Sequence, residues 1–402
     1  MWLKWFPWKY LIRRIARTHG FLDPIALISH LQRFAKPSEV AEPLELLRAG
    51  VLLHARGLVN RKVIQHNLDW LWPYWVEKQF DPASESFIPR AFSISHVNLT
   101  HRNWTAVGLP GCSDFPIVDP RGLVTPYWDG WSLDGWIVTD SRDTLCPSME
   151  PVSEQRLVHA NDRLSVHTDT RRNHLTIHSE TYLTRQNRRS VCHVDYHVRA
   201  GKPAWFVIAL RPYNPEGISF VNKITLDPQR RSWEVDKKHT VHFSKPVDRH
   251  IVSTYADGDL YGKLLANSET SSSSCDVGLA TAAGMFQLEQ NQENRFQLTV
   301  DFTSKETDDE HLQLGVPWDE ALKPAAQLEV PETSFVELYN TAVSTLVLLS
   351  PGSVYPGPYT YKRFWYRDAA FMVHALLCTG FKERVGYLLE RFPQDQKLSG
   401  YF

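Results

Sequence analysis

Late in the chain, an Arg-Asp pair combines the residue types best suited to specific polar recognition. Arg367 and Asp368 end the run YPGPYTYKRFWYRD, residues 355–368, and begin an apolar segment with helical periodicity. Arg offers a planar fork of hydrogen-bond donors, and a carboxylate offers two acceptor oxygens. Together they can bind two vicinal hydroxyl groups, and Trp365 and Tyr366 place aromatic rings directly before them. The pair is therefore a candidate site for a polyhydroxylated ligand.

Ordinary structural roles also explain this pair, so its surroundings matter. An Asp in the first turn of a helix is stabilised by the helix dipole, and an adjacent Arg can form a solvated ion pair. Here the pair opens a predicted helix over about 367–379, which ends at Gly380 as many helices do. A second helix is predicted over about 382–392, and the chain then reads QDQKLSGYF, residues 394–402.

This order of motif, helix and loop resembles the six-hairpin glycosidases of the glucoamylase and glycogen-debranching type. In that group an aromatic-x-Arg-Asp motif begins an inner helix of an (α/α)6 toroid, and a Gln…Gly-aromatic loop follows the next helix. The resemblance covers residues 334–402 and implies that Arg367 and Asp368 bind the sugar beside the scissile bond. It implies that Trp365 and Tyr366 form the wall of that subsite, and it implies no metal ion or other cofactor.

Catalysis is a separate question, because hydrolysis needs two carboxyl groups that flank the scissile bond. In the resembled enzymes both come from later helices, and a twelve-helix toroid needs at least ~200 residues. Residues 334–402 are too few, so we expect an incomplete toroid and assign no catalytic residue. The predicted helix from Arg367 is apolar nearly all round, which is typical of a buried helix. We therefore expect an exposed apolar patch and association with a second copy or a missing segment.

Two other clusters allow more than one interpretation. Residues 119–136 include Trp128, Trp131 and Trp136 with Asp129 and Asp134, which either bind sugar or mark hairpin turns and packed rings. On predicted strands, one face carries His193, Asp195 and His197 and another carries His174, His178 and Glu180. These side chains form a metal site or, as we favour, the solvated face of a sheet that is buried on one side. We expect no metal.

The periodicity predicts an α+β multidomain chain. Residues 1–80 read as a helical segment, and alternating patterns such as VCHVDYHVR at 191–199 predict a large, supersandwich-like β-sandwich over 85–305. The apolar run WFVIAL at 205–210 predicts a strand buried on both faces. An acidic, proline-rich linker is predicted over 306–333, and the incomplete (α/α)6 toroid over 334–402, with a helix at about 334–350.

Composition narrows the functional classes. The chain has 402 residues with a net charge of -1, so it lacks the general basic character of a nucleic-acid-binding protein. The five cysteines form no CxxC pair, and an odd, sparse set fits a reducing compartment. No signal peptide and no stretch of 18 apolar residues is visible, so we predict a cytoplasmic protein without a membrane span.

Three functional hypotheses follow. The first is an inverting, metal-independent glycoside hydrolase that acts on α-glucans or oligosaccharides, or an N-terminal fragment of such an enzyme. The second is a noncatalytic carbohydrate-binding or assembly protein with the same predicted domains. The third is a truncated reading frame with no function of its own. A coding sequence that continues past Phe402 into further paired helices favours the first hypothesis.

Overall fold

The computed structural model describes residues 69–73 and 104–396, except 142, 161, 187–188, 216, 267–268, 303–315, 359–361 and 363, together with Val63. The predicted helical segment 1–80 therefore lies outside the described residues, apart from Val63 and 69–73. Residues 85–103 of the predicted sandwich also lie outside them.

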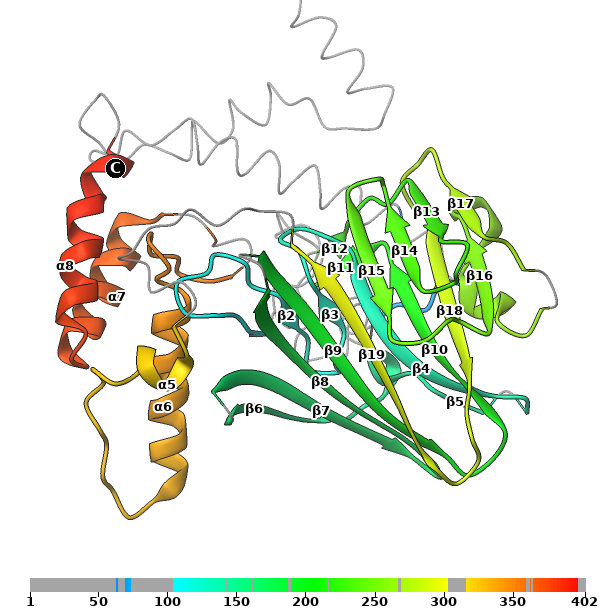
Figure 1. Ribbon diagram of the computed structural model, residues 1–402, viewed down its shortest axis with the longest axis horizontal. Coiled ribbons are helices and arrows are strands. Elements are labelled where there is room, and N and C mark those ends of the chain that lie inside the picture. Colours follow the sequence, from blue (N-terminus) through cyan, green and yellow to red (C-terminus); the bar gives the residue numbers. More distant parts are fainter. Residues whose placement is uncertain are drawn as a thin grey trace, which may run out of the picture. The chain divides into compact units, whose positions relative to one another are not determined.

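One sheet has eight antiparallel strands, most of which are labelled in Figure 1. Its strands are, in spatial order, β1 (Thr105–Ala106), β2 (Ile117–Val118), β3 (Val124–Thr125), β4 (Ser132–Thr139), β10 (Ala204–Arg211), β18 (Thr281–Gln287) and β16 (Arg249–Ser253), with β5 (Thr144–Leu145) paired to β4. Strand β10 contains the apolar run 205–210 and is buried almost throughout, which confirms the predicted strand with two covered faces.

A second sheet has nine antiparallel strands, of which β6 to β9 and β19 are long neighbours in Figure 1. In spatial order its strands are β17 (Ser272–Ser274), β13 (Lys223–Leu226), β14 (Ser232–Val235), β15 (His239–Phe243), β19 (Glu293–Asp301), β9 (Arg189–Ala200), β8 (Leu175–Gln186), β7 (Arg163–Arg172) and β6 (Glu154–Ala160). A separate hairpin joins β11 (Tyr213–Asn214) to β12 (Gly217–Ile218).

The two large sheets pack face to face. Gly135 of β4 lies directly over Tyr196 of β9, and a Cβ atom at position 135 would come within 2.7 Å of the Tyr196 ring. The Phe296 ring of β19 lies 4.7 Å from the Phe206 ring of β10 and 4.9 Å from the Phe286 ring of β18, measured between ring centroids. The alternating sequence pattern buries these rings between the sheets because successive side chains point to opposite faces.

A fully buried ion pair attaches residues 69–73 to the sandwich. The Arg211 guanidinium donates to both carboxylate oxygens of Asp259, at 2.9 and 2.6 Å, and to the Leu71 carbonyl at 3.2 Å. The Leu71 backbone N–H donates to the same carboxylate at 2.6 Å. Trp70 and Trp136 lie within 5.4 Å of the guanidinium carbon. Every charge in this cluster thus has a partner, which a buried charge requires.

Helices follow the sheets along the chain. They are α5 (Trp318–Ala321), α6 (Thr333–Leu348), α7 (Tyr366–Cys378) and α8 (Lys382–Arg391), and the 3-10 helices are η3 (Pro147–Met149), η4 (Tyr255–Asp257), η5 (Leu260–Lys263) and η7 (Phe392–Asp395). Helix α5 lies within the predicted linker over 306–333. Its Trp318 is buried, and the indole N–H donates to the Gly108 carbonyl at 3.1 Å. This ring anchors the segment to the sheet region, which the proline content of the sequence did not indicate.

The chain is therefore α+β, with large sheets followed by a small group of helices. One apolar cluster joins Phe115 and Leu164 of the sheet region to Val347, Val373 and Leu388 of the helices α6, α7 and α8. The described helices also carry apolar side chains that are exposed to solvent: Phe335 and Leu338 on α6, Phe371 and Leu377 on α7, and Leu389 on α8.

Candidate functional site

The Arg-Asp pair lies in the first turn of α7. The Arg367 side chain is 81% exposed, and its guanidinium lies 3.5 Å from the Asp368 carboxylate. Asp368 is half-buried and sits where the helix dipole favours a negative charge. An ion pair this exposed contributes little to stability. The guanidinium and the carboxylate therefore face water together, close enough to bind one polyhydroxylated ligand.

Aromatic residues surround this turn. Trp365 is the half-buried N-cap residue of α7 and makes no side-chain capping bond, so its ring serves packing rather than capping. Tyr366 is exposed, and its ring meets the edge of Phe392 at a centroid distance of 6.1 Å. Phe364 meets the same ring at 5.1 Å. The four residues that the sequence singled out are thus adjacent in one turn, with Phe392 of η7 behind them.

The tryptophan-rich stretch 119–136 divides into exposed and buried residues. Trp136 is fully buried in β4, and Asp134 is buried and accepts a hydrogen bond from the Ser148 hydroxyl at 2.6 Å. Burial raises the pKa of Asp134. Neither residue can touch a saccharide, so the sugar-binding interpretation is wrong for this pair. Trp128, in contrast, is 58% exposed in the loop between β3 and β4.

Around that loop lies a cavity of about 380 Å³, which we call the Trp128 pocket. Its lining includes residues 127–131, Phe220, His239, Phe302 and Lys362. Inside it, the Tyr127 and His239 rings are 3.9 Å apart at 34°, and Trp131 and Phe302 approach Tyr127 edge-on at 5.7 and 5.2 Å. The Tyr127 hydroxyl donates to the Asp301 carbonyl at 2.8 Å, which fixes the ring.

Sequence reasoning found Trp128, Asp129 and Trp131 but missed most of this pocket. Phe220 follows β12, His239 begins β15, and Lys362 precedes α7, so three distant segments meet at one place. Only the strand order brings them together. The available sequence signal was the Gly-containing turn with two tryptophans, which identified one wall of the cavity.

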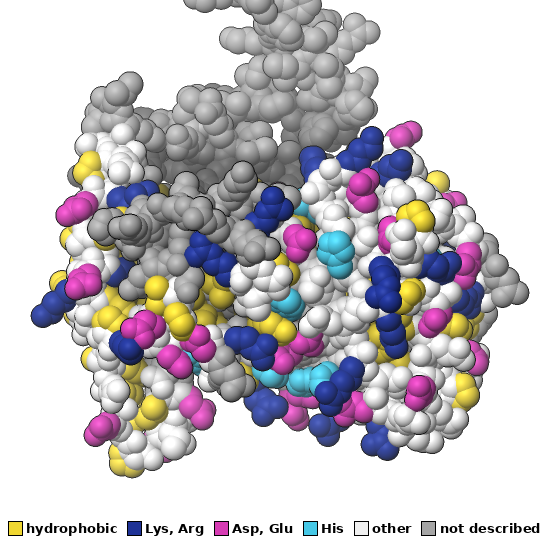
Figure 2. Space-filling view, in the orientation of Figure 1, with side chains coloured by type: hydrophobic (Ala, Val, Ile, Leu, Met, Phe, Trp, Pro, Cys, Tyr) yellow, Lys and Arg dark blue, Asp and Glu magenta, His cyan; other side chains and the backbone are white. Residues whose placement is uncertain are grey.

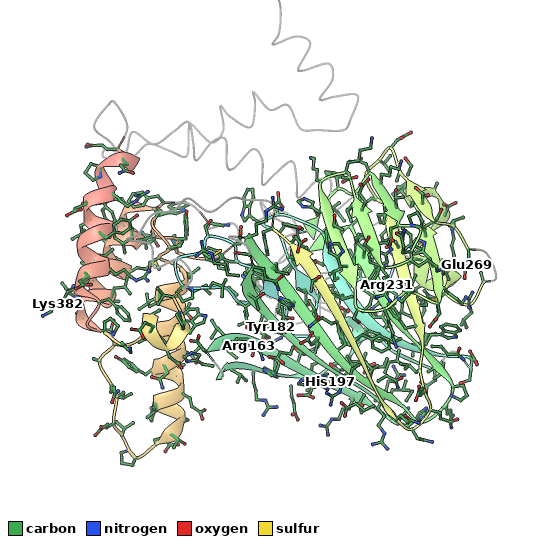
Figure 3. All side chains as sticks on the ribbon, in the orientation of Figure 1. Arg163, Tyr182, His197, Arg231, Glu269 and Lys382 are labelled. Atoms are coloured by element: carbon green, nitrogen blue, oxygen red, sulfur yellow. The ribbon has the colours of Figure 1, made fainter. Side chains whose placement is uncertain are left out.

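A polar face covers strands β7, β8, β9 and β19. Figure 2 shows histidine, basic and acidic side chains gathered there. The cross-strand pairs are regular: His178 bonds to Asp169 at 3.0 Å and His197 to Glu293 at 3.0 Å. On the same face, the Arg163 guanidinium lies 4.1 Å from the Tyr182 ring centroid (Figure 3).

These histidines form hydrogen bonds with neighbouring side chains. His193 bonds to the Thr184 hydroxyl at 2.7 Å, and Asp195 accepts from Tyr182 and Gln297. Among the residues that the structure describes, no group of three His, Cys, Asp or Glu side chains is arranged to hold a metal ion. Burial lowers the pKa of His193, so this ring is mostly neutral near pH 7. His178 and His197 thus lie on a partly exposed face, whereas His193 is buried.

Comparison with known proteins identifies no family for this chain. No family model and no curated protein matches the sequence. A bacterial glucoamylase complexed with acarbose is structurally similar with a TM-score of 0.48 and 10% identity, over 74% of this chain and 52% of that one. A 4-alpha-glucanotransferase from Thermococcus litoralis gives a TM-score of 0.30 and 8% identity, over 50% and 38%. The chain thus spans about half or less of these proteins, and similarity at this level establishes neither homology nor activity.

No helix in the described part of the chain is long and apolar enough to cross a membrane. All five cysteines are free, and four of them are buried.

Proposed function

We propose that this chain is a glycoside hydrolase-like protein of the glucoamylase or glycogen-debranching kind, acting on α-glucans or oligosaccharides. The observation that carries the proposal is the first turn of α7, where Trp365, Tyr366, Arg367 and Asp368 lie together. The order of two packed sheets, a short connecting helix and paired helices supports it. In this proposal α6, α7 and α8 are the first helices of an (α/α)6 toroid.

The chemistry of binding follows from the side chains. The Arg367 guanidinium presents parallel N–H donors, and the Asp368 carboxylate, 3.5 Å away, presents acceptor oxygens. Two neighbouring sugar hydroxyls can accept hydrogen bonds from the guanidinium and donate hydrogen bonds to the carboxylate. The single ammonium group of a lysine cannot reproduce this geometry. Tyr366 is exposed beside them and offers a ring face to the apolar C–H surface of a pyranose.

A second candidate function is noncatalytic carbohydrate binding. The Trp128 pocket favours it, because it presents an exposed aromatic ring and buried polar atoms within the sandwich itself. Both candidate functions involve binding of a carbohydrate, but only the first involves its hydrolysis. We assign no general acid or base, because the resemblance attributes both to helices other than the ones described.

Location and assembly complete the proposal. A cytoplasmic protein agrees with five unpaired cysteines. The solvent-exposed apolar residues of α6 and α7, with Phe335 59% exposed, support association through the helices, as a second copy or a further segment would bury them.

Calorimetric titration with maltotriose tests the proposal. The unmodified chain is expected to bind, and Arg367→Gln or Asp368→Asn is expected to weaken binding at least tenfold, which corresponds to ~1.4 kcal/mol. Lys382→Gln is the matched control, since it removes one positive charge from the exposed start of α8. Equal affinities for Arg367→Gln and Lys382→Gln would reject the assigned site, and absence of glucan binding would reject the proposal.

A further inference from the structure

The Trp128 pocket has the features of a binding site for a neutral sugar ring, and they are independent of the α7 turn. Its rim carries two exposed rings, Trp128 at 58% and Phe220 at 56%. Solvent exposure of a large aromatic side chain is unfavourable, and two on one cavity are a marker of ligand contact. Pyranose rings have apolar C–H faces and hydroxylated edges, so exposed aromatic faces suit them.

Two residues that line the pocket carry buried polar atoms without a hydrogen-bond partner among the described residues. Trp131 is only 3% exposed, and its indole N–H has no hydrogen-bond partner among the described residues. The Nδ1 atom of His239 is also buried and without a partner among them. Both residues line the cavity, and their rings are 6.3 Å apart. Burying such atoms unpaired costs free energy, which a ligand with hydroxyl groups would recover.

The polar atoms differ in their chemistry. The indole nitrogen can only donate, whereas the imidazole can donate or accept according to its tautomer. Burial lowers the pKa of His239, so this ring is neutral near pH 7 and does not add a charge. A sugar hydroxyl can accept a hydrogen bond from the indole N–H, and it can donate to or accept from the imidazole nitrogen. These two uncharged groups can therefore hydrogen-bond to an alcohol without adding a charge to the pocket.

The loop that forms the rim is held in place by side chains from other segments. Asn214 donates to the Gly130 carbonyl at 2.7 Å, and Ser219 donates to the Asp129 carbonyl at 3.1 Å. Asp129 has a left-handed backbone with φ 55°, and Asp236 of the facing turn has φ 52°. Non-glycine residues adopt this region rarely and at an energetic cost, and such conformations concentrate at ligand sites. A fixed loop binds with less loss of entropy.

The pocket lining carries charged residues of both signs. Lys362 is half-buried, with its ammonium 4.9 Å above the Phe115 ring, and Asp114 lies in the same lining. Burial lowers the pKa of Lys362, while Asp114 opposes that effect. Asp129, Asp236 and Lys238 also line the cavity. The mixture selects neither anions nor cations strongly, and it supplies further donors and acceptors for hydroxyl groups.

From these features we infer that the Trp128 pocket binds a neutral hexopyranosyl unit of an oligosaccharide, with Trp128 and Phe220 as the rings it contacts. The inference rests on the proposed function for the choice of sugar, since the pocket chemistry alone defines only a polyhydroxylated ring. Lys362 lies three residues before Trp365, so one segment contributes to this pocket and then continues into the α7 turn. The cavity volume of about 380 Å³ lies within the range of ~300–1,000 Å³ found for small-molecule sites.

The test is a titration of the full chain with maltotriose, cellotriose and tri-N-acetylchitotriose, followed by calorimetry. Trp128→Ala and Phe220→Ala are each expected to weaken binding at least tenfold. Phe335→Ala is the matched control, because that ring is 59% exposed on α6 and outside the pocket. It is expected to leave the affinity unchanged. In a ¹⁵N-tryptophan-labelled chain, the indole signal that Trp131→Phe removes is expected to shift on binding.

The outcomes separate this inference from the proposed function. Maltotriose binding that Arg367→Gln weakens but Trp128→Ala and Phe220→Ala do not, with no shift of the Trp131 signal, would overturn the pocket and leave the proposed function in place. Binding of cellotriose or the chitotriose alone, sensitive to Trp128→Ala, would support the pocket and reject the α-glucan proposal. Binding of none of the three sugars would overturn the pocket assignment, whatever the folded state of the variants.

Discussion

The buried Arg211–Asp259 pair gives a prediction about stability that needs no assumption about function. The Asp259 carboxylate accepts from Arg211 twice, from the Leu71 N–H at 2.6 Å and from the Tyr261 N–H at 2.9 Å. Both side chains of the ion pair are essentially inaccessible to water. Asp259→Asn removes the negative charge and one acceptor, and it leaves a guanidinium enclosed by Trp70, Trp136 and Tyr213.

The magnitude follows from burial. Breaking a buried ion pair by removing one partner costs about 3–5 kcal/mol, because the remaining charge cannot return to water. Asp257→Asn is the matched control. That residue lies two positions away, and its side chain is 53% exposed beside Lys263 at 3.7 Å. Its loss is expected to cost at most about 1 kcal/mol. Replacing both members, as in Arg211→Met with Asp259→Asn, removes the unpaired charge and keeps an amide oxygen as acceptor for the backbone N–H groups, so it is expected to recover part of the loss.

Urea unfolding followed by far-UV circular dichroism and by tryptophan fluorescence measures these differences. Fluorescence is informative because two indoles lie beside the guanidinium. Equal midpoints for Asp259→Asn and Asp257→Asn would refute the reasoning. So would a double variant that is less stable than Asp259→Asn alone, since it would mean that the charge itself is not what the site must neutralise.

Three further predictions concern pH, packing and turnover. Burial lowers the pKa of His250 to about 4, so the unfolded chain binds the extra proton between pH 6.5 and 4, and stability is lost as the pH falls through that window. Urea midpoints at pH 7 and pH 5 should show a loss of about 2 kcal/mol that His250→Asn largely removes. Gly135→Ala places a methyl group 2.7 Å from the Tyr196 ring and is expected to cost about 1–3 kcal/mol in thermal unfolding, and a neutral effect would contradict the tight contact between the sheets. We assign no catalytic residue, so the chain is expected to bind maltotriose without releasing glucose, and turnover abolished by changing one of its own carboxylates would contradict this expectation.

The sequence predicted those parts of the fold that depend on local periodicity. Helices α6, α7 and α8 begin and end within about two residues of the expected positions, because their apolar spacing and Gly380 are local signals. The buried strand β10 followed from its continuous apolar run. Helix α5 was missed, since four residues give almost no periodic signal and Trp318 is anchored by a distant carbonyl.

The candidate site was less predictable, for a physical reason. The α7 turn is a contiguous motif, so its four residues could be named together. The residues of the Trp128 pocket come from segments that are distant in the sequence. The order of the strands in the sheets brings His239 of β15 and Phe302, which follows β19, beside Tyr127. Residue types in the tryptophan-rich stretch did not distinguish the exposed Trp128 from the buried Trp136, because one lies in a loop and the other in a central strand.

A crystal structure of the chain with maltotriose tests the central claim most directly. We predict electron density for a sugar at the start of α7, with two vicinal hydroxyls within ~3.2 Å of the Arg367 guanidinium and the Asp368 carboxylate. A well-occupied maltotriose with no contact to either side chain, while the α7 turn remains accessible to solvent in the crystal, would contradict the account.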